Sequence, residues 1–101
     1  MNHTWTKGSN KDLLRTILIK EEYAEVLEAT DAENMLKELA DLSYVTFGFA
    51  ATFGWDLDEA IRRVHASNMS KLGDDGQPIH RPDGKVLKGP NYEEPYLTDL
   101  V

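Results

Sequence analysis

Capping residues and glycines divide most of this chain into segments of helical pattern, and this division restricts the possible folds more than any other feature. Ser-Asn at 9–10 can cap a helix that we expect over about residues 11–29. Thr-Asp-Ala-Glu at 30–33 has capping-box spacing and predicts a second helix that continues to about residue 53, where Gly54 ends it. Two long helices therefore follow each other across a short loop.

The same signals predict a third helix. Asp-Leu-Asp-Glu at 56–59 repeats the capping-box spacing, and the helical pattern continues to about residue 72, before Gly73. Short loops between consecutive helices favour antiparallel packing. We therefore expect an all-α protein, an antiparallel bundle of three main helices, with a helical domain over residues 11–73 after a flexible lead over residues 1–10.

The helical pattern is lost from residue 74 onward. Pro-Asp-Gly at 82–84 lies between two short segments, 78–81 and 85–88, and this arrangement predicts a hairpin or hairpin-like loop. We expect residues 74–101 to form this hairpin and an irregular tail that packs on the same domain.

Acidic side chains continue the apolar lines of the first two predicted helices. At 100° per residue, the line that begins at Leu14 and Leu18 continues as glutamates. On the second helix, Glu38 is in line with the apolar residues Met35, Leu42, Val45 and Phe49. An unpaired carboxylate that faces a core is strongly destabilising. These carboxylates therefore need either basic partners or a cation.

A divalent metal suits these carboxylates better than the nearby basic residues, because Arg15, Lys20 and Lys37 lie mostly off the acidic line. The acids form two pairs whose members are three residues apart and share a helix face, Glu22 with Glu25 and Glu38 with Asp41. A single pair of this kind is more often a solvated face that Lys20 or Lys37 supports. Two pairs on adjacent helices favour an all-oxygen site for Mg²⁺ or Mn²⁺.

Motifs in a fixed order carry a resemblance to a known superfamily. Glu-Glu-Tyr-Ala-Glu at 21–25 is followed by Glu-Leu-Ala-Asp at 38–41, by Val-His-Ala-Ser-Asn-Met-Ser-Lys at 64–71 and by Asp-Gly-Lys-Val-Leu-Lys-Gly-Pro-Asn-Tyr at 83–92. This set resembles the MazG-like all-α nucleoside triphosphate pyrophosphohydrolases, which include dimeric dUTPases and phosphoribosyl-ATP pyrophosphohydrolase. The resemblance covers about residues 12–96.

The resemblance implies Mg²⁺-dependent hydrolysis of a (d)NTP to the monophosphate and pyrophosphate, an activity that cleans nucleotide pools. It implies a metal site formed by Glu22, Glu25, Glu38 and Asp41. Glu21 would ligate metal or orient the attacking water, so that Glu21, Glu22 and Lys71 form the catalytic set. The expected substrate contacts are Asn68 with metal or ribose, Lys71 with phosphate, and Lys88 and Tyr92 from the C-terminal motif.

Charge and composition exclude several other classes of protein. With 11 basic and 18 acidic residues the net charge is −7, whereas nucleic-acid polymers and anionic membranes require a basic face. The absence of cysteine excludes disulfides and thiolate metal sites, and the three histidines lack ligand spacing. No apolar run approaches the roughly 20 residues of a membrane span. We therefore expect a cytoplasmic protein that binds no nucleic-acid polymer and no membrane; its nucleotide substrate is what the resemblance implies.

An apolar second face on the second helix predicts self-association. Tyr44, Phe47 and Ala51 form this face, and a second subunit would cover it, so we expect oligomerisation to a dimer or tetramer to complete the bundle. Two alternative functions remain. One is hydrolysis of phosphoribosyl-ATP. The other is a non-catalytic helical binding module, because about ten residues precede the first helix where relatives usually carry another helix.

Overall fold

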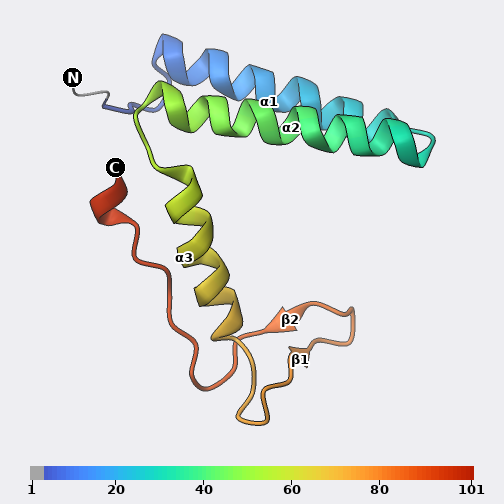
Figure 1. Cartoon of the computed structure of the whole chain (residues 1–101), viewed down its shortest axis with the longest axis vertical. Coiled ribbons are helices and arrows are strands. Elements are labelled where there is room, and N and C mark those ends of the chain that lie inside the picture. The colour runs from blue at the N-terminus through green and yellow to red at the C-terminus, as the bar shows by residue number, and fades with distance from the viewer. Residues whose placement is uncertain (1–3) are drawn as a thin grey trace. The chain divides into compact units, whose positions relative to one another are not determined.

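The computed structural model describes residues 4–101, and helices dominate its secondary structure (Figure 1). The elements in order are α1 (Asn10–Glu28), α2 (Ala32–Thr52), α3 (Leu57–Met69), β1 (Ile79–His80), β2 (Val86–Leu87) and the 3₁₀ turn η1 (Thr98–Leu100). The all-α prediction is confirmed. The chain divides into two units, one ending at Leu57 and the other spanning Asp58–Val101, and each is described by itself.

Helices α1 and α2 form the first unit and lie side by side as an antiparallel pair (Figure 1). Ser9 caps α1 as expected, because its hydroxyl accepts a hydrogen bond from the Asp12 amide. The cap of α2 is Asp31 rather than Thr30, and its carboxylate accepts from the Asn34 amide. The short connection between these helices keeps the end of α1 next to the start of α2, so acids on both sides of the loop can come close together.

The buried face of α1 differs from the predicted line. Leu14 is 56% exposed, and the half-buried positions of α1 are centred about a quarter turn away, at Arg15, Leu18, Ile19, Glu22 and Val26. The reason is that apolar residues occupy most sides of the first half of α1, so the pattern does not single out one face. Glu22 consequently points toward α2 on the same line as Leu18.

Aromatic residues pack together at the end of α2. Phe53 is buried at 5% exposed, and its ring centroid lies 5.6 Å from that of Phe49 and 5.1 Å from that of Trp55. The Phe49 and Phe53 rings are tilted and the Phe53 and Trp55 rings are stacked, and aromatic pairs at these distances contribute beyond the area they bury. Gly54 follows with φ of +71°, a conformation in which glycine lacks the steric penalty of other residues, and the chain leaves the helix there as predicted.

Helix α3 ends at Met69, three residues before the predicted end. The Ser70 amide donates to both Ala66 O and Ser67 O, and the Ser70 hydroxyl donates to Ser67 O at 2.6 Å. The next amides continue in tighter turns, and the Gly73 amide turns away to donate to Gln77 O. A serine that hydrogen-bonds the local backbone therefore ends the helix before the glycine does.

The predicted hairpin is present in the second unit. Strands β1 and β2 are antiparallel, with Ile79 opposite Leu87 and His80 opposite Val86. Gly84 has φ of +90° in the connecting turn. The chain then returns to α3, where the Gly89 amide donates to Lys71 O at 2.7 Å.

The C-terminal segment packs along α3 (Figure 1). The Ser67 hydroxyl is buried and donates to Glu93 O at 2.7 Å. Arg63 donates to both carboxylate oxygens of Asp99 and to Tyr96 O, which fixes the end of the chain on the same helix. No helix within residues 4–101 is both long enough and apolar enough to cross a bilayer.

Candidate metal centre

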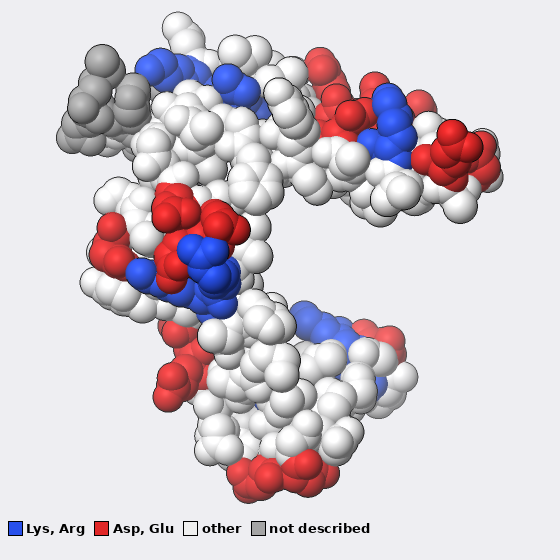
Figure 2. Space-filling model, in the orientation of Figure 1, with Lys and Arg blue, Asp and Glu red and all other residues white. Residues whose placement is uncertain are grey.

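Four carboxylates from two helices meet near the loop that joins α1 and α2. Glu22 and Glu25 come from α1, and Glu38 and Asp41 come from α2. Each offers one oxygen that lies within 4.8 Å of the oxygens offered by the others. Figure 2 shows acidic side chains gathered around basic ones at this end of the helix pair. The structure therefore brings together the residues that the spacing of three predicted, which we call the acid cluster.

Two oxygens of the acid cluster are buried and lack hydrogen-bond partners within residues 4–101. Glu38 is only 5% exposed, and its Oε2 atom is buried without a hydrogen-bond partner among residues 4–101. Glu22 Oε2 is buried and unpartnered in the same way. Buried carboxylate oxygens without partners are costly, so a proton or a cation is needed to satisfy them. An all-carboxylate donor set of this kind suits hard cations such as Mg²⁺.

The pKa of Glu25 in the acid cluster is raised toward neutrality. Hydrogen bonding to Glu38 and then to Glu22, together with the negative charge of both, raises the pKa of Glu25 to about 7. Glu25 is itself exposed, so hydrogen bonding to Glu38 and Glu22 and the negative charge of both are the main causes of the raised pKa, and burial adds least. A divalent cation among these groups would replace the proton of Glu25.

Lys37 contacts the acid cluster, which corrects the expectation that the nearby basic residues lie off it. Its Nζ atom lies 2.9 Å from Asp41 Oδ2 and 3.3 Å from Glu38 Oε1. The hydrogen bonds to Asp41 and Glu38 raise the pKa of the Lys37 ammonium, which therefore stays charged. Asn34 Nδ2 also donates to Glu38 Oε1, at 3.3 Å. The spacing of four residues between Lys37 and Asp41 is the signal that could have predicted this contact.

Glu21 and Asn68 lie outside the acid cluster. Glu21 is exposed on α1, one residue before Glu22, and is not among the residues that share the metal-binding geometry in the described chain. Asn68 is exposed in the last turn of α3. Their roles in orienting water and contacting the nucleotide stay predictions.

The remaining predicted substrate residues gather in the second unit. Lys88 Nζ lies 4.7 Å from the centroid of the Tyr92 ring, a cation–π contact. Lys71 joins them through its backbone, because Lys71 O accepts from the Gly89 amide. A side chain on Gly89 would be prevented by Lys71 O, only 2.5 Å from the position of a Cβ atom. The close approach therefore requires glycine at this position.

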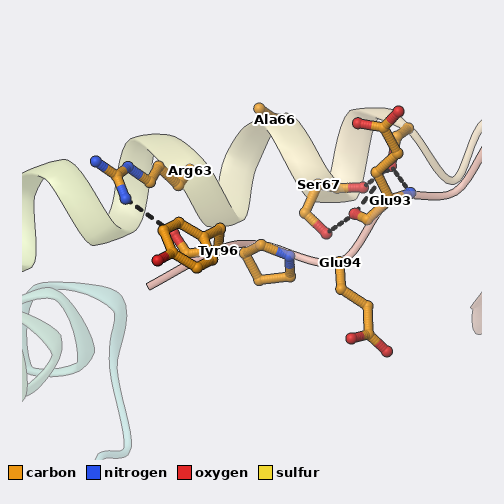
Figure 3. Close-up of a pocket in the computed structure, with 8 residues that line it drawn as sticks. Arg63, Ala66, Ser67, Glu93, Glu94 and Tyr96 are labelled. Carbon is orange, nitrogen blue, oxygen red and sulfur yellow. Dashed lines mark hydrogen bonds between the residues drawn. The ribbon is translucent and has the colours of Figure 1, made fainter. Parts of the chain in front are cut away.

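A pocket of about 280 Å³ lies between α3 and the C-terminal segment (Figure 3). Hydrogen bonds from Ser67 and Arg63 to the backbone of the C-terminal segment cross it. None of the predicted site residues lines it; its lining residues are Arg63, Ala66, Ser67, Ser70, Glu93, Glu94, Pro95 and Tyr96. Because its serine and arginine donors already have partners within the chain, this pocket does not provide the metal chemistry of the acid cluster.

Comparison with known proteins identifies a family for this chain. Residues 2–68 match the model of the phosphoribosyl-ATP pyrophosphohydrolase family. The chain belongs to this family. The family lies within the MazG-like all-α superfamily, so the resemblance read from the motifs is confirmed. No curated protein matches the chain.

Membership in this family implies that the chain is a pyrophosphohydrolase that acts on a nucleotide. Members of the phosphoribosyl-ATP pyrophosphohydrolase family are typically dependent on a divalent metal, and the acid cluster could hold one. The match includes every residue of the acid cluster and ends at Asn68. Lys71, Lys88 and Tyr92 follow the matched segment.

Proposed function

We propose that the protein is a Mg²⁺-dependent pyrophosphohydrolase that converts a (d)NTP to its monophosphate and pyrophosphate. The observation that carries the proposal is the acid cluster with its buried, unpartnered oxygens on Glu22 and Glu38. Two helices hold these oxygens together against their mutual repulsion, and a bound cation would offset that repulsion. Family membership supports the reaction class.

Glu22, Glu25, Glu38 and Asp41 would hold the metal, which we take to be Mg²⁺ with Mn²⁺ as a substitute. When bound, a divalent ion neutralises phosphate charge and lowers the pKa of a coordinated water. Glu22 Oε2 and Glu38 Oε2 fit this role because neither has a partner within the described chain.

Glu21 is proposed to orient the attacking water. It is exposed and immediately precedes Glu22, and no ion pair within residues 4–101 occupies its carboxylate. A free carboxylate next to a metal ligand can accept a proton from water as the phosphorus–oxygen bond forms.

Basic and aromatic groups of the second unit are proposed to bind the nucleotide. The Lys71 and Lys88 ammonium groups are suited to phosphate, and the Tyr92 ring next to Lys88 offers a face for stacking. Asn68, exposed on α3, is proposed to contact ribose or metal-bound groups.

Exposed apolar side chains support self-association as a dimer or tetramer. Along α2, Leu36 is 70% exposed and Tyr44 is 81% exposed, while Leu39 and Phe47 are each 46% exposed. At 100° per residue Leu36, Tyr44 and Phe47 fall on one side of the helix, and an exposed apolar face of this kind indicates an interface. We propose that a second copy of the chain covers it.

A panel of nucleotides with pyrophosphate detection tests the proposal. Canonical and modified (d)NTPs with Mg²⁺ or Mn²⁺ are expected to release pyrophosphate, and EDTA is expected to abolish the release. Phosphoribosyl-ATP belongs in the panel as a second candidate substrate because the matching family bears its name. Turnover of that substrate alone would select the alternative, and nucleotide binding without any product would select a non-catalytic binding module.

Glu38→Gln is the matched variant for this panel. The amide keeps the size of the side chain but removes a metal-binding charge, so pyrophosphate release is expected to fall at least about 100-fold. Circular dichroism should remain helical. Glu28→Gln, the same change at an exposed position one turn beyond Glu25, serves as the control and is expected to retain activity.

A further inference from the structure

Lys37 provides the positive charge at the acid cluster. No other Lys, Arg or His within residues 4–101 forms an ion pair with any of the four carboxylates. Its ammonium spans two carboxylates of α2, at 2.9 Å from Asp41 Oδ2 and 3.3 Å from Glu38 Oε1. The metal-free protein therefore has an internal cation where the proposed function requires a divalent one.

The Lys37 ammonium can move away from Glu38 and Asp41. Its side chain is 64% exposed, whereas that of Glu38 is 7% exposed and cannot turn to solvent without opening the helix pair. A lysine side chain is flexible, and its ammonium is readily hydrated. Movement of Lys37 consequently costs little, and Glu38 stays in place, held also by Asn34 Nδ2.

A second carboxylate lies within helical reach of Lys37, on the side of the helix start. A hollow of about 340 Å³ at the start of α2 is lined by Asp31, Glu33, Asn34 and Lys37. Glu33 precedes Lys37 by four residues, the order and spacing at which glutamate and lysine pair on a helix. Lys37 thus has one carboxylate a turn ahead, Asp41, and another a turn behind, Glu33.

A divalent ion and the ammonium cannot share the same carboxylates without strong repulsion, because like charges a few ångström apart repel even in a partly solvated site. We propose that Lys37 is a tethered cation that holds Glu38 and Asp41 in the metal-free protein and yields them to the divalent ion by turning to Glu33. Lys37 thereby sets the metal affinity of the site. This inference rests on the proposed metal-dependent function and adds a residue outside the carboxylate set.

Calorimetric titration of the full chain with Mn²⁺ alone tests this role without any measurement of turnover. Lys37→Met removes the competing charge while keeping the length of the side chain, and Lys37→Gln is a second variant with a polar end. Both are expected to bind Mn²⁺ at least about fivefold more tightly than wild type. Lys37→Arg keeps the charge and is expected to stay within about twofold of wild type.

Lys11→Met is the matched control. It makes the same charge change on α1, but eleven residues before Glu22, which is about 16 Å along a helix axis. Its Mn²⁺ affinity is expected to equal that of wild type. A gain in Lys11→Met equal to that in Lys37→Met would reduce the effect to net charge and overturn the proposal.

A double-mutant cycle with Glu33 tests where the ammonium goes. Glu33→Gln in the wild-type background removes the second place for Lys37 and is expected to weaken Mn²⁺ binding about threefold. The same change in the Lys37→Met background is expected to have no effect. Equal weakening in both backgrounds would show a general charge effect and would contradict the exchange between Asp41 and Glu33.

The outcomes separate this inference from the proposed function. Wild-type protein that binds no Mn²⁺ would refute the metal site and Lys37's role together. Wild-type protein that binds Mn²⁺, with unchanged or weaker binding in both Lys37→Met and Lys37→Gln, would refute the role of Lys37 alone. Circular dichroism of each variant establishes that it is folded before titration.

Discussion

Glu25 on α1 and Glu38 on α2 face each other across the helix pair, with an oxygen of each within 4.8 Å of the other. This contact, together with that to Glu22, raises the pKa of Glu25 to about 7. The helix pair thus brings these acids close enough to share a proton. A divalent ion that binds here has to displace that proton. Charged groups around Glu25 are Glu22, Glu38 and Asp41 on one side and Lys37 as the counter-charge.

Metal binding is expected to release a proton from Glu25 below neutral pH. A carboxyl must be deprotonated to ligate a metal, so Mn²⁺ affinity should fall up to about tenfold for each pH unit below 7 and level off above 8. Calorimetry in two buffers of different ionisation enthalpy at pH 6 measures the protons released. Glu25→Gln should remove the release, and an unchanged value in that variant would assign the proton to another group.

The stability of the metal-free protein is expected to fall as pH rises from about 5 to 8. A carboxyl whose pKa is raised from 4.5 to about 7 contributes stability below its unfolded pKa and loses it as pH passes through 7. Asp12 and Asp99 have lowered pKa values, so their contributions are lost only in the more acidic range. Thermal melting in EDTA measures this slope, and Mg²⁺ at pH 8 should raise the melting temperature. A flat profile in EDTA would contradict the shared proton.

Much of the fold could be predicted because local signals and tertiary structure agree. Ser9 and Gly54 mark helix ends that the structure retains, and Pro-Asp-Gly at 82–84 marks the hairpin turn. The acid cluster followed from two pairs three residues apart, since that spacing fixes a shared face and a short loop fixes the neighbouring helix.

Other features could not be predicted because they depend on choices between equivalent alternatives. Several sides of α1 are apolar, so its angular pattern places Leu14 on the core-facing line with Leu18, whereas Leu14 is exposed and only Leu18 is half-buried. The helical angles put the Lys37 Cα atom off the acidic line, but the long side chain of Lys37 reaches Asp41. Helix α3 ends before the predicted residue because the Ser70 hydroxyl hydrogen-bonds Ser67 O, whereas the prediction relied on Gly73 as the stop.

Gly89→Ala is expected to release the C-terminal segment from the end of α3. A Cβ atom would lie 2.5 Å from Lys71 O and 2.6 Å from Leu72 O, both backbone atoms, so the 2.7 Å hydrogen bond from the Gly89 amide must break. We expect a loss of about 2 kcal/mol in stability of the second unit, and faster hydrogen exchange at residues 86–92. Gly76→Ala is not a suitable control because Gly76 has φ of +76°. Gln77→Ala, in the same exposed turn as Gly76, is a suitable control. It should leave the hydrogen exchange at residues 86–92 unchanged.

Phe47→Asp is expected to dissociate the proposed oligomer. Phe47 is 46% exposed on α2 beside Tyr44, which is 81% exposed, and burying an unpaired carboxylate in an apolar interface costs several kcal/mol. The dissociation constant should therefore rise roughly 100-fold or more. Light scattering after size-exclusion chromatography over a range of concentrations measures it. Gln77→Asp adds the same charge at an exposed turn and should leave the mass unchanged. If wild type is a monomer at every concentration, or if Phe47→Asp keeps the oligomeric mass, a second copy does not cover this face.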